Sequence, residues 1–143
     1  MRFFLDTNVL VYALHRQAEH HEKADELITR CLSRGCPCYF LSSSLKDVYY
    51  ILNRHYLSEE DARRCVRMLR RALDMVDLDS AVVDAAFEND EPDFEDGIVR
   101  AAAELLQVDA VVSYDADAFG RSPVPKLTAE QALLLLEGEA QAL

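Results

Sequence analysis

Four aspartates, far apart in the sequence, are the side chains whose type and setting are best suited to chemistry. Asp6 ends a short apolar run, and Asp47 interrupts a longer one. Asp96 lies in the acidic start of an Ala-rich segment, and Asp115 follows another short apolar run. Oxygen ligands without an accompanying set of Cys and His suit Mg²⁺ or Mn²⁺, ions that activate water and polarise a phosphodiester. Together, the four acids indicate a divalent-metal site.

Each acid also has a purely structural explanation. Asp6 can cap a helix that begins after it, and Asp47 can stabilise a first helical turn through the helix dipole. Asp96 can pair with Arg100 one turn later, which is worth only a few tenths of a kcal/mol. Asp115 can form a simple turn. The joint pattern favours the metal site, because a carboxylate at the end of a buried strand costs free energy unless it is paired or bound to a metal.

Strand and helix signals alternate along the chain. The expected strands span residues 2–5, 38–41, 75–78, 110–113 and 123–127. The expected helices span residues 9–14, 19–33, 45–56, 58–73, 80–87 and 93–106, with one more after residue 128. This alternation predicts a parallel sheet covered by helices on both faces. Ligands bind beyond the carboxyl ends of the strands in such sheets, and Asp6 and Asp115 both lie just past strand ends.

The residues around the expected helices predict where the helices begin and what they bury. Ser42–Ser44 offer an N-cap for the helix at 45–56, and Thr128 offers one for the last helix, with an amide at the capping-box position. The helix at 45–56 is apolar nearly all round its middle, which predicts burial for Asp47 within it. Asp96 shares its helix face with apolar side chains, so we expect it to point toward protein.

Composition predicts one domain that spans residues 1–143. Half of the residues are hydrophobic, enough for a sizeable core at this length. The apolar run at residues 1–5 is too short for a signal peptide or a membrane span, so we expect a cytoplasmic protein without a membrane partner. The spacing of the four cysteines does not resemble a zinc site, and in a reducing cytosol free cysteines behave as small hydrophobes.

The net charge of −11 opposes a general affinity for nucleic acid, because phosphate backbones attract basic surfaces. An acidic balance does fit a site that concentrates divalent cations, and it also fits a protein that binds a basic partner. The Arg-rich helix at 58–73 is the one strong basic patch of the sequence. It either binds RNA or forms a solvated face, and the solvated face is the commoner case.

Four ordered motifs resemble the PIN domain, and within it the VapC-like toxin ribonucleases of bacterial toxin–antitoxin pairs. The first is an apolar strand followed by Asp-x-Asn at residues 3–10, and the second is an acidic motif at 43–52. The third is the acidic helix start at 93–97, and the last is the run at 111–119 that ends in Phe. The resemblance runs from residue 3 to about residue 135. Asp47 stands where Glu is common, and Ser113 stands where Thr is usual.

The resemblance implies a three-layer α/β/α fold with a central, mainly parallel sheet of four to five short strands. It also implies an endoribonuclease, dependent on Mg²⁺ or Mn²⁺, that hydrolyses RNA phosphodiester bonds with an activated water. It assigns the catalytic and metal-binding roles to four acids: Asp6, Asp47, Asp96 and Asp115. Asn8 and Ser113 are implied to orient ligands or water, and Asp93 and Asp117 are additional candidates. An antitoxin partner and a homodimer are implied as well.

Alternatives to the ribonuclease stay open. A catalytically weak PIN-like module that binds a protein partner would have the same fold but little affinity for metal. A phosphotransfer domain with Asp6 as nucleophile is less favoured, because position 8 is Asn and no Lys follows an expected strand. In the ribonuclease, Lys46 and Arg100 are candidates for contact with phosphate, although each of these types is more often solvated or ion-paired.

Overall fold

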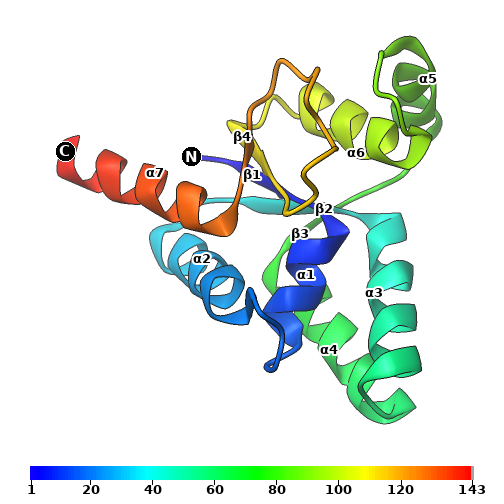
Figure 1. The fold of residues 1–143 in the computed structure, drawn as a ribbon, viewed down its shortest axis with the longest axis vertical. Helices are drawn as coiled ribbons and strands as arrows, with labels where there is room; N and C mark the ends of the chain where they lie inside the picture. The colour runs from blue at the N-terminus through cyan, green and yellow to red at the C-terminus, as the bar shows by residue number, and fades with distance from the viewer. Residues whose placement is uncertain (143) are drawn as a thin grey trace.

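A parallel sheet of five short strands lies at the centre of residues 1–142, the part of the chain that the computed structural model describes (Figure 1). The strands are β1 (Phe3–Leu5), β2 (Cys38–Leu41), β3 (Asp74–Val76), β4 (Ala110–Val112) and β5 (Lys126–Leu127). Their order across the sheet is β3-β2-β1-β4-β5. Phe4 lies opposite Tyr39 on one side and Val111 on the other. The predicted parallel sheet is therefore confirmed, with β1 at its centre.

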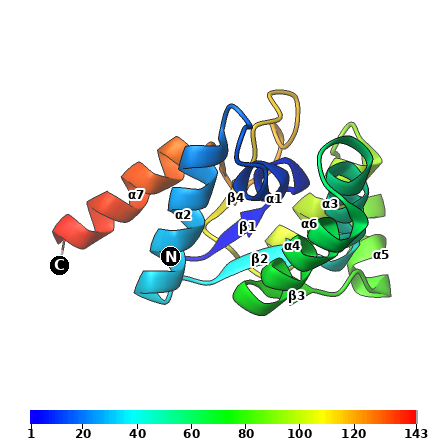
Figure 2. The same cartoon turned by 90° about the horizontal axis from the view of Figure 1, so that it is seen from below.

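Helices cover both faces of the sheet, which confirms the expected three layers. They are α1 (Thr7–Leu14), α2 (His21–Arg34), α3 (Ser42–His55), α4 (Glu59–Ala72), α5 (Ser80–Glu88), α6 (Phe94–Leu105) and α7 (Ala129–Ala142). Figure 1 shows α5 and α6 on one side of the sheet and α1, α2 and α7 on the other. Figure 2 shows α2 and α7 side by side, where Arg30 pairs with Glu137 at 2.9 Å.

The alternation of side chains along β1 divides the core into two clusters. Phe3 and Leu5 pack into the cluster that includes side chains of α1, α2, α3, α4 and α7. Phe4 points to the opposite face and packs into the cluster beneath α5 and α6. This two-residue alternation is the geometry of any strand. All three β1 side chains are fully buried, which explains why the strand reads as continuously apolar in the sequence.

The helix starts agree with the predicted caps at two of three places. Asp6 caps α1 by accepting a hydrogen bond from the Thr7 amide, and Thr128 and Gln131 form a reciprocal capping box. The expected serine cap of α3 is wrong, because α3 begins at Ser42, directly after β2, and its N-terminus has no side-chain cap. The Ser42 hydroxyl instead accepts a hydrogen bond from a backbone amide 36 residues away.

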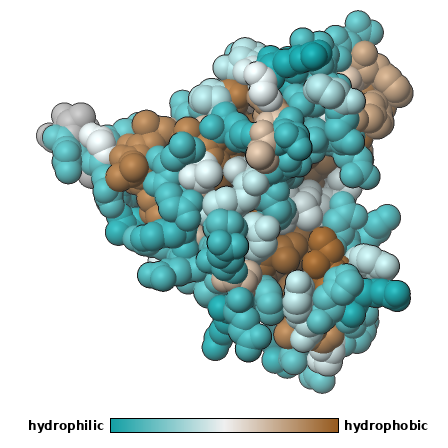
Figure 3. All heavy atoms as spheres, viewed as in Figure 1, coloured by the Kyte–Doolittle hydropathy of each residue, from teal (hydrophilic) through white to brown (hydrophobic). Residues whose placement is uncertain are grey.

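The surface is mostly hydrophilic in the view of Figure 3, with apolar side chains exposed over α7 and at the end of α5 beside α6. Among the large apolar side chains that are exposed, Leu134 and Leu135 belong to α7, Phe87 to α5 and Phe94 to α6. None of these four side chains lines the pocket described below. Among residues 1–142, no helix has both the length and the hydropathy that crossing a membrane requires.

Candidate active site

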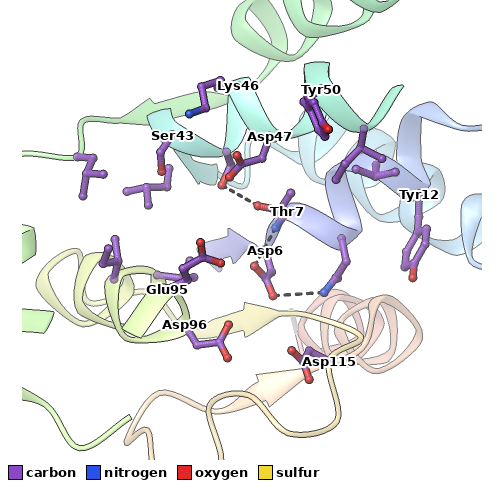
Figure 4. Close-up of a pocket in the computed structure, with 18 of the residues that line it drawn as sticks. Asp6, Thr7, Tyr12, Ser43, Lys46, Asp47, Tyr50, Glu95, Asp96 and Asp115 are labelled. Carbon is purple, nitrogen blue, oxygen red and sulfur yellow. Dashed lines mark hydrogen bonds between the residues drawn. The ribbon is translucent and has the colours of Figure 1, made fainter. Parts of the chain in front are cut away.

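An open pocket of about 850 Å³ lies at the carboxyl ends of β1 and β2, between α1, α3 and α6. Figure 4 shows its walls. All four predicted acids line it: Asp6, Asp47, Asp96 and Asp115. They come from the end of β1, the first half of α3, the first turn of α6 and the loop after β4. The fold thus brings together carboxylates that are far apart in the sequence.

Asp6 is the most firmly held of these acids. Its backbone amide continues the sheet by donating to the Val112 carbonyl, and its side chain is only 8% exposed. One carboxylate oxygen accepts from the Thr7 amide at 2.9 Å, and the other accepts from Ser113 Oγ at 2.8 Å and Asn8 Nδ2 at 3.3 Å. Burial raises the pKa of Asp6, although these three donors oppose the rise. The carboxylate is therefore fixed in place, and its charge is only partly compensated for the loss of water around it.

Asn8 and Ser113 connect Asp6 to the loop after β4. The Ser113 hydroxyl donates to Asp6 and accepts from Asn8 Nδ2 at 3.2 Å and from the Asp115 amide at 3.1 Å. The Asn8 side-chain oxygen accepts from the Tyr114 amide at 3.1 Å. Ser113 thus uses its one donor and both of its acceptor positions. The network sets the position of the backbone that carries Asp115 relative to Asp6.

Asp96 lies in the first turn of α6, where the Asp93 carboxylate caps the helix by accepting from the Asp96 amide at 3.0 Å. Burial raises the pKa of Asp96 to about 6, and the charges of Asp93, Asp6, Asp115 and Glu91 add to the rise. Like charges raise a carboxyl pKa only when they are close. Asp96 is therefore electrostatically coupled to two other pocket acids, and it is half-buried, as its apolar helix face predicted.

The expected burial of Asp47 is wrong, because its side chain is exposed at the pocket wall. The core-facing side of α3 consists of Ser44, Val48 and Leu52. Ile51, one of the apolar neighbours that suggested burial, packs against the core from one side but also lines the open pocket. A hydrophobic pattern alone does not distinguish a pocket wall from a core. Asp115 is also exposed.

Asn8 and Lys46 line the pocket as well, but the additional acidic candidates, Asp93 and Asp117, do not. Asp93 is the exposed cap of α6, and the Asp117 amide donates to Asp115 Oδ1 from an exposed turn. The alternative explanation of Asp96, a pair with Arg100, does not apply. Arg100 is 8% exposed and instead lies 2.7 Å from both Asp90 and Glu104.

The charges that line the pocket are strongly unbalanced. Among the described lining residues five are acidic, and Lys46 alone is basic. The fifth acid is Glu95, whose carboxylate Figure 4 shows beside the pocket. The sequence reasoning missed Glu95, although its place next to Asp96 in an acidic helix start was a signal. Three tyrosines, Tyr12, Tyr50 and Tyr56, line the pocket as well.

The chemistry of this donor set fits a hard divalent cation. Carboxylate, amide and hydroxyl oxygens are the ligands that Mg²⁺ and Mn²⁺ prefer, and a bound cation would relieve the burial and repulsion that raise the pKa values of Asp6 and Asp96. Within residues 1–142, however, no three His, Cys, Asp or Glu side chains are gathered closely enough to hold an ion as they stand. The fold brings the acids to one pocket, and side chains would have to move for three of them to hold an ion together.

Tyr114, between Ser113 and Asp115, is anchored from outside the pocket. Its hydroxyl donates to Glu130 of α7 at 2.9 Å, and its ring stacks on His20 with centroids 3.9 Å apart. No motif in the sequence pointed to these contacts, because they join segments that are far apart along the chain. They fix the loop that carries Asp115 to α7 and to the connection between α1 and α2.

Comparison with known proteins agrees with this geometry. A model of the PIN domain family matches residues 2–117, so α7 lies outside the matched part. The comparison with curated proteins gave no match. Among solved structures, VapC20 of Mycobacterium tuberculosis is 16% identical with a TM-score of 0.64, over 80% of this chain and 91% of that chain. FitAcB from Neisseria gonorrhoeae is 16% identical with a TM-score of 0.67, over 90% of this chain and 98% of that chain.

DNA-bound VapBC from Salmonella typhimurium is 18% identical with a TM-score of 0.67, over 90% of this chain and 98% of that chain. At these identities the likenesses show a shared fold. The family model covers most of the chain, and the matched residues include all four acids that line the pocket. The chain belongs to the PIN domain family.

Proposed function

We propose that this protein is a divalent-metal-dependent endoribonuclease that hydrolyses RNA phosphodiester bonds. The observation that carries the proposal is the convergence of carboxylates from four separate elements on one pocket in which Lys46 is the only basic lining residue described. Asp6, Asp96 and Asp115 are the acids that we expect to hold Mg²⁺ or Mn²⁺. Asp47 faces the same space from α3 and completes the set.

The bound ion would supply Lewis-acid polarisation of the phosphodiester and a lower pKa for the attacking water. The side chains of this chain have separate tasks around it. Asp6 offers a rigid carboxylate, because three donors fix it. Asn8 and Ser113 orient Asp6 and the loop of Asp115. Lys46 places a positive charge on the wall of the pocket, where a substrate phosphate enters.

We also propose that the protein is the toxin of a toxin–antitoxin pair. VapC20 of Mycobacterium tuberculosis is described as a sarcin–ricin loop cleaving toxin, and another structure of the same fold is a toxin–antitoxin complex from Klebsiella pneumoniae. An antitoxin protein is then the expected partner, and a homodimer the expected assembly. The net charge of −11 supports a partner with a basic segment, because opposite charges steer association.

Cleavage of RNA by the purified full chain tests the proposal. We expect cleavage in Mg²⁺ or Mn²⁺, none in EDTA, and a loss of more than about 100-fold in Asp6→Asn and Asp96→Asn, because even outer-shell changes at metal sites cost about 10- to 100-fold. Asp93→Asn is the matched control, since Asn keeps the helix cap and the residue lies outside the pocket lining. Equal cleavage by folded Asp6→Asn protein, or cleavage in EDTA, would contradict the assignment.

A second candidate is a catalytically weak PIN-like module that acts by binding a protein partner. The observation that favours it is the spacing of the acids, since no three of them gather within ligand distance among the residues described. This candidate predicts binding of a partner without RNA cleavage and without Mn²⁺ uptake that depends on the pocket acids. Titration calorimetry with Mn²⁺ separates the two candidates.

A further inference from the structure

Helix α4 concentrates positive charge on one element of an acidic protein. It carries Arg63, Arg64, Arg67, Arg70 and Arg71, five of the fifteen Lys and Arg residues in a chain of net charge −11. The first two of these arginines are neutralised within the helix. Arg63 contacts Glu59 at 2.6 Å, and Arg64 lies 3.2 Å from an acid three positions earlier.

The remaining three arginines have no such partners. Within residues 1–142, Arg67, Arg70 and Arg71 form no ion pair or side-chain hydrogen bond, and all three are exposed. They stand three and four positions apart, so they lie on one face of the helix. Like charges at this spacing destabilise a helix by about 0.2–0.5 kcal/mol per pair. An anionic ligand would offset this repulsion, because it would attract all three arginines.

The same arginines surround a hollow of about 350 Å³ with an apolar floor. Leu45 and Val66 form the floor, and Arg63, Arg67, Arg70 and Arg71 form the rim, a set that we call the arginine hollow. Guanidinium groups bind phosphate through paired N–H donors, which makes such a rim suited to successive phosphates of one strand. The apolar floor suits a sugar or a base.

The arginine hollow adjoins the candidate active site across the first turn of α3. Leu45 belongs to the floor of the hollow, and Lys46, the next residue, belongs to the wall of the pocket. The pocket itself is acidic and repels a phosphate backbone. A nuclease with this charge therefore needs an attractive surface next to its active site, because non-specific binding of nucleic acid is mainly electrostatic.

We propose that the arginine hollow binds the phosphate backbone of RNA beside the cleaved bond. The inference rests on the proposed ribonuclease function and assigns part of its substrate-binding surface. The competing occupant is an acidic protein segment, such as residues 77–96 of a second copy, which hold nine acids and no basic residue. RNA is favoured because the hollow lies beside the pocket in which the phosphodiester reacts.

The test is the salt dependence of RNA binding by the full chain. Anisotropy of a labelled single-stranded RNA of about 16 nucleotides is measured in EDTA, which keeps the strand intact. The variant changes Arg67, Arg70 and Arg71 to Ala. Its matched control, Lys23→Ala with Arg64→Ala and Arg121→Ala, removes the same number of positive charges, but from side chains that already have partners. Thermal unfolding followed by circular dichroism confirms that both proteins fold.

Each single-strand phosphate contact contributes about 0.7 to the slope of log affinity against log salt. Loss of three contacts should reduce the slope by about 2. Over a fourfold rise in salt, the affinity of the wild type should therefore fall about 20-fold more than that of the arginine variant. The control should keep the wild-type slope. Unchanged affinity and slope in the arginine variant would overturn the proposal. A second outcome would also overturn it: the slope for RNA binding is unchanged, but the arginine variant loses a salt-sensitive self-association that sedimentation detects in the wild type. That result would assign the hollow to a contact between protein copies.

These results are independent of catalysis. If the wild type cleaves RNA but the arginine variant binds it normally, the nuclease stands and the arginine hollow is refuted. If the slope falls as expected but the wild type shows no metal-dependent cleavage, the RNA surface stands and the nuclease is refuted.

Discussion

Replacing Asp96 by Asn should make the metal-free protein more stable while removing a candidate metal ligand. The carboxyl of Asp96 has a pKa of about 6 in the folded chain, against an ordinary value of 3.8. Because the folded-state pKa is the higher one, the folded state binds the proton more tightly. Stability therefore falls as the pH rises from about 4 to about 6, and the loss stays constant above that window. Asn carries no charge and avoids this cost.

The size of the effect follows from the shift and from two opposing factors. The full shift is equivalent to about 3 kcal/mol, an upper bound. Asp96 is partly open to solvent, which screens its charge, and its place in the first turn of α6 gains about 0.3–1 kcal/mol from the helix dipole. We expect Asp96→Asn to raise the free energy of unfolding by about 1 kcal/mol near neutral pH and to have little effect near pH 4.

Urea unfolding in EDTA, followed by circular dichroism at the two pH values, measures this difference. Asp47→Asn is the control, because it removes an exposed pocket acid and should change stability by less than about 0.5 kcal/mol. In buffer without EDTA, added Mn²⁺ should stabilise the wild type by mass action and leave Asp96→Asn unchanged. A destabilised Asp96→Asn protein at neutral pH, or a gain of the same size near pH 4, would refute the electrostatic reasoning.

Two further substitutions test contacts around the pocket. Tyr114→Phe removes the hydroxyl that donates to Glu130 at 2.9 Å. We expect the free energy of unfolding, measured with urea, to fall by about 1 kcal/mol and calorimetry to show weaker Mn²⁺ binding. Unchanged Mn²⁺ affinity would argue against a positioning role for Tyr114. Arg100→Ala leaves the Glu91 carboxylate, which is 1% exposed, without its cation. We expect the free energy of unfolding, measured with urea, to fall by about 3 kcal/mol or more. A fall of less than about 1 kcal/mol would contradict this reasoning.

The sheet and part of the site could be predicted because their signals are local. The strands β1 and β4 are short and fully buried, so they appear in the sequence as continuous apolar runs. Parallel strands share their carboxyl edge, so the sequence alone is enough to place Asp6 and Asp115 at the same edge. The acidic start of α6 is a local signal of the same kind, and it placed Asp96 correctly at a helix N-terminus.

The features that could not be predicted depend on long-range packing. The sequence could not show that Ile51, which packs against the core, also lines an open pocket, and this led to the wrong burial for Asp47. The partners of Arg100 include Asp90, ten residues earlier in a connecting segment and beyond any helical spacing. The bond of Tyr114 to Glu130 joins the matched PIN region to α7.

Titration of Mn²⁺ into the purified full chain, followed by calorimetry, tests most directly whether the pocket acids form a metal site. The informative pair is Asp115→Asn and Asp117→Asn, two residues apart in the same exposed loop, of which only Asp115 lines the pocket. We predict Mn²⁺ binding by the wild type and by Asp117→Asn, and a loss of more than about tenfold in affinity for Asp115→Asn. Equal binding by both variants, or no binding by the wild type, would contradict the metal site.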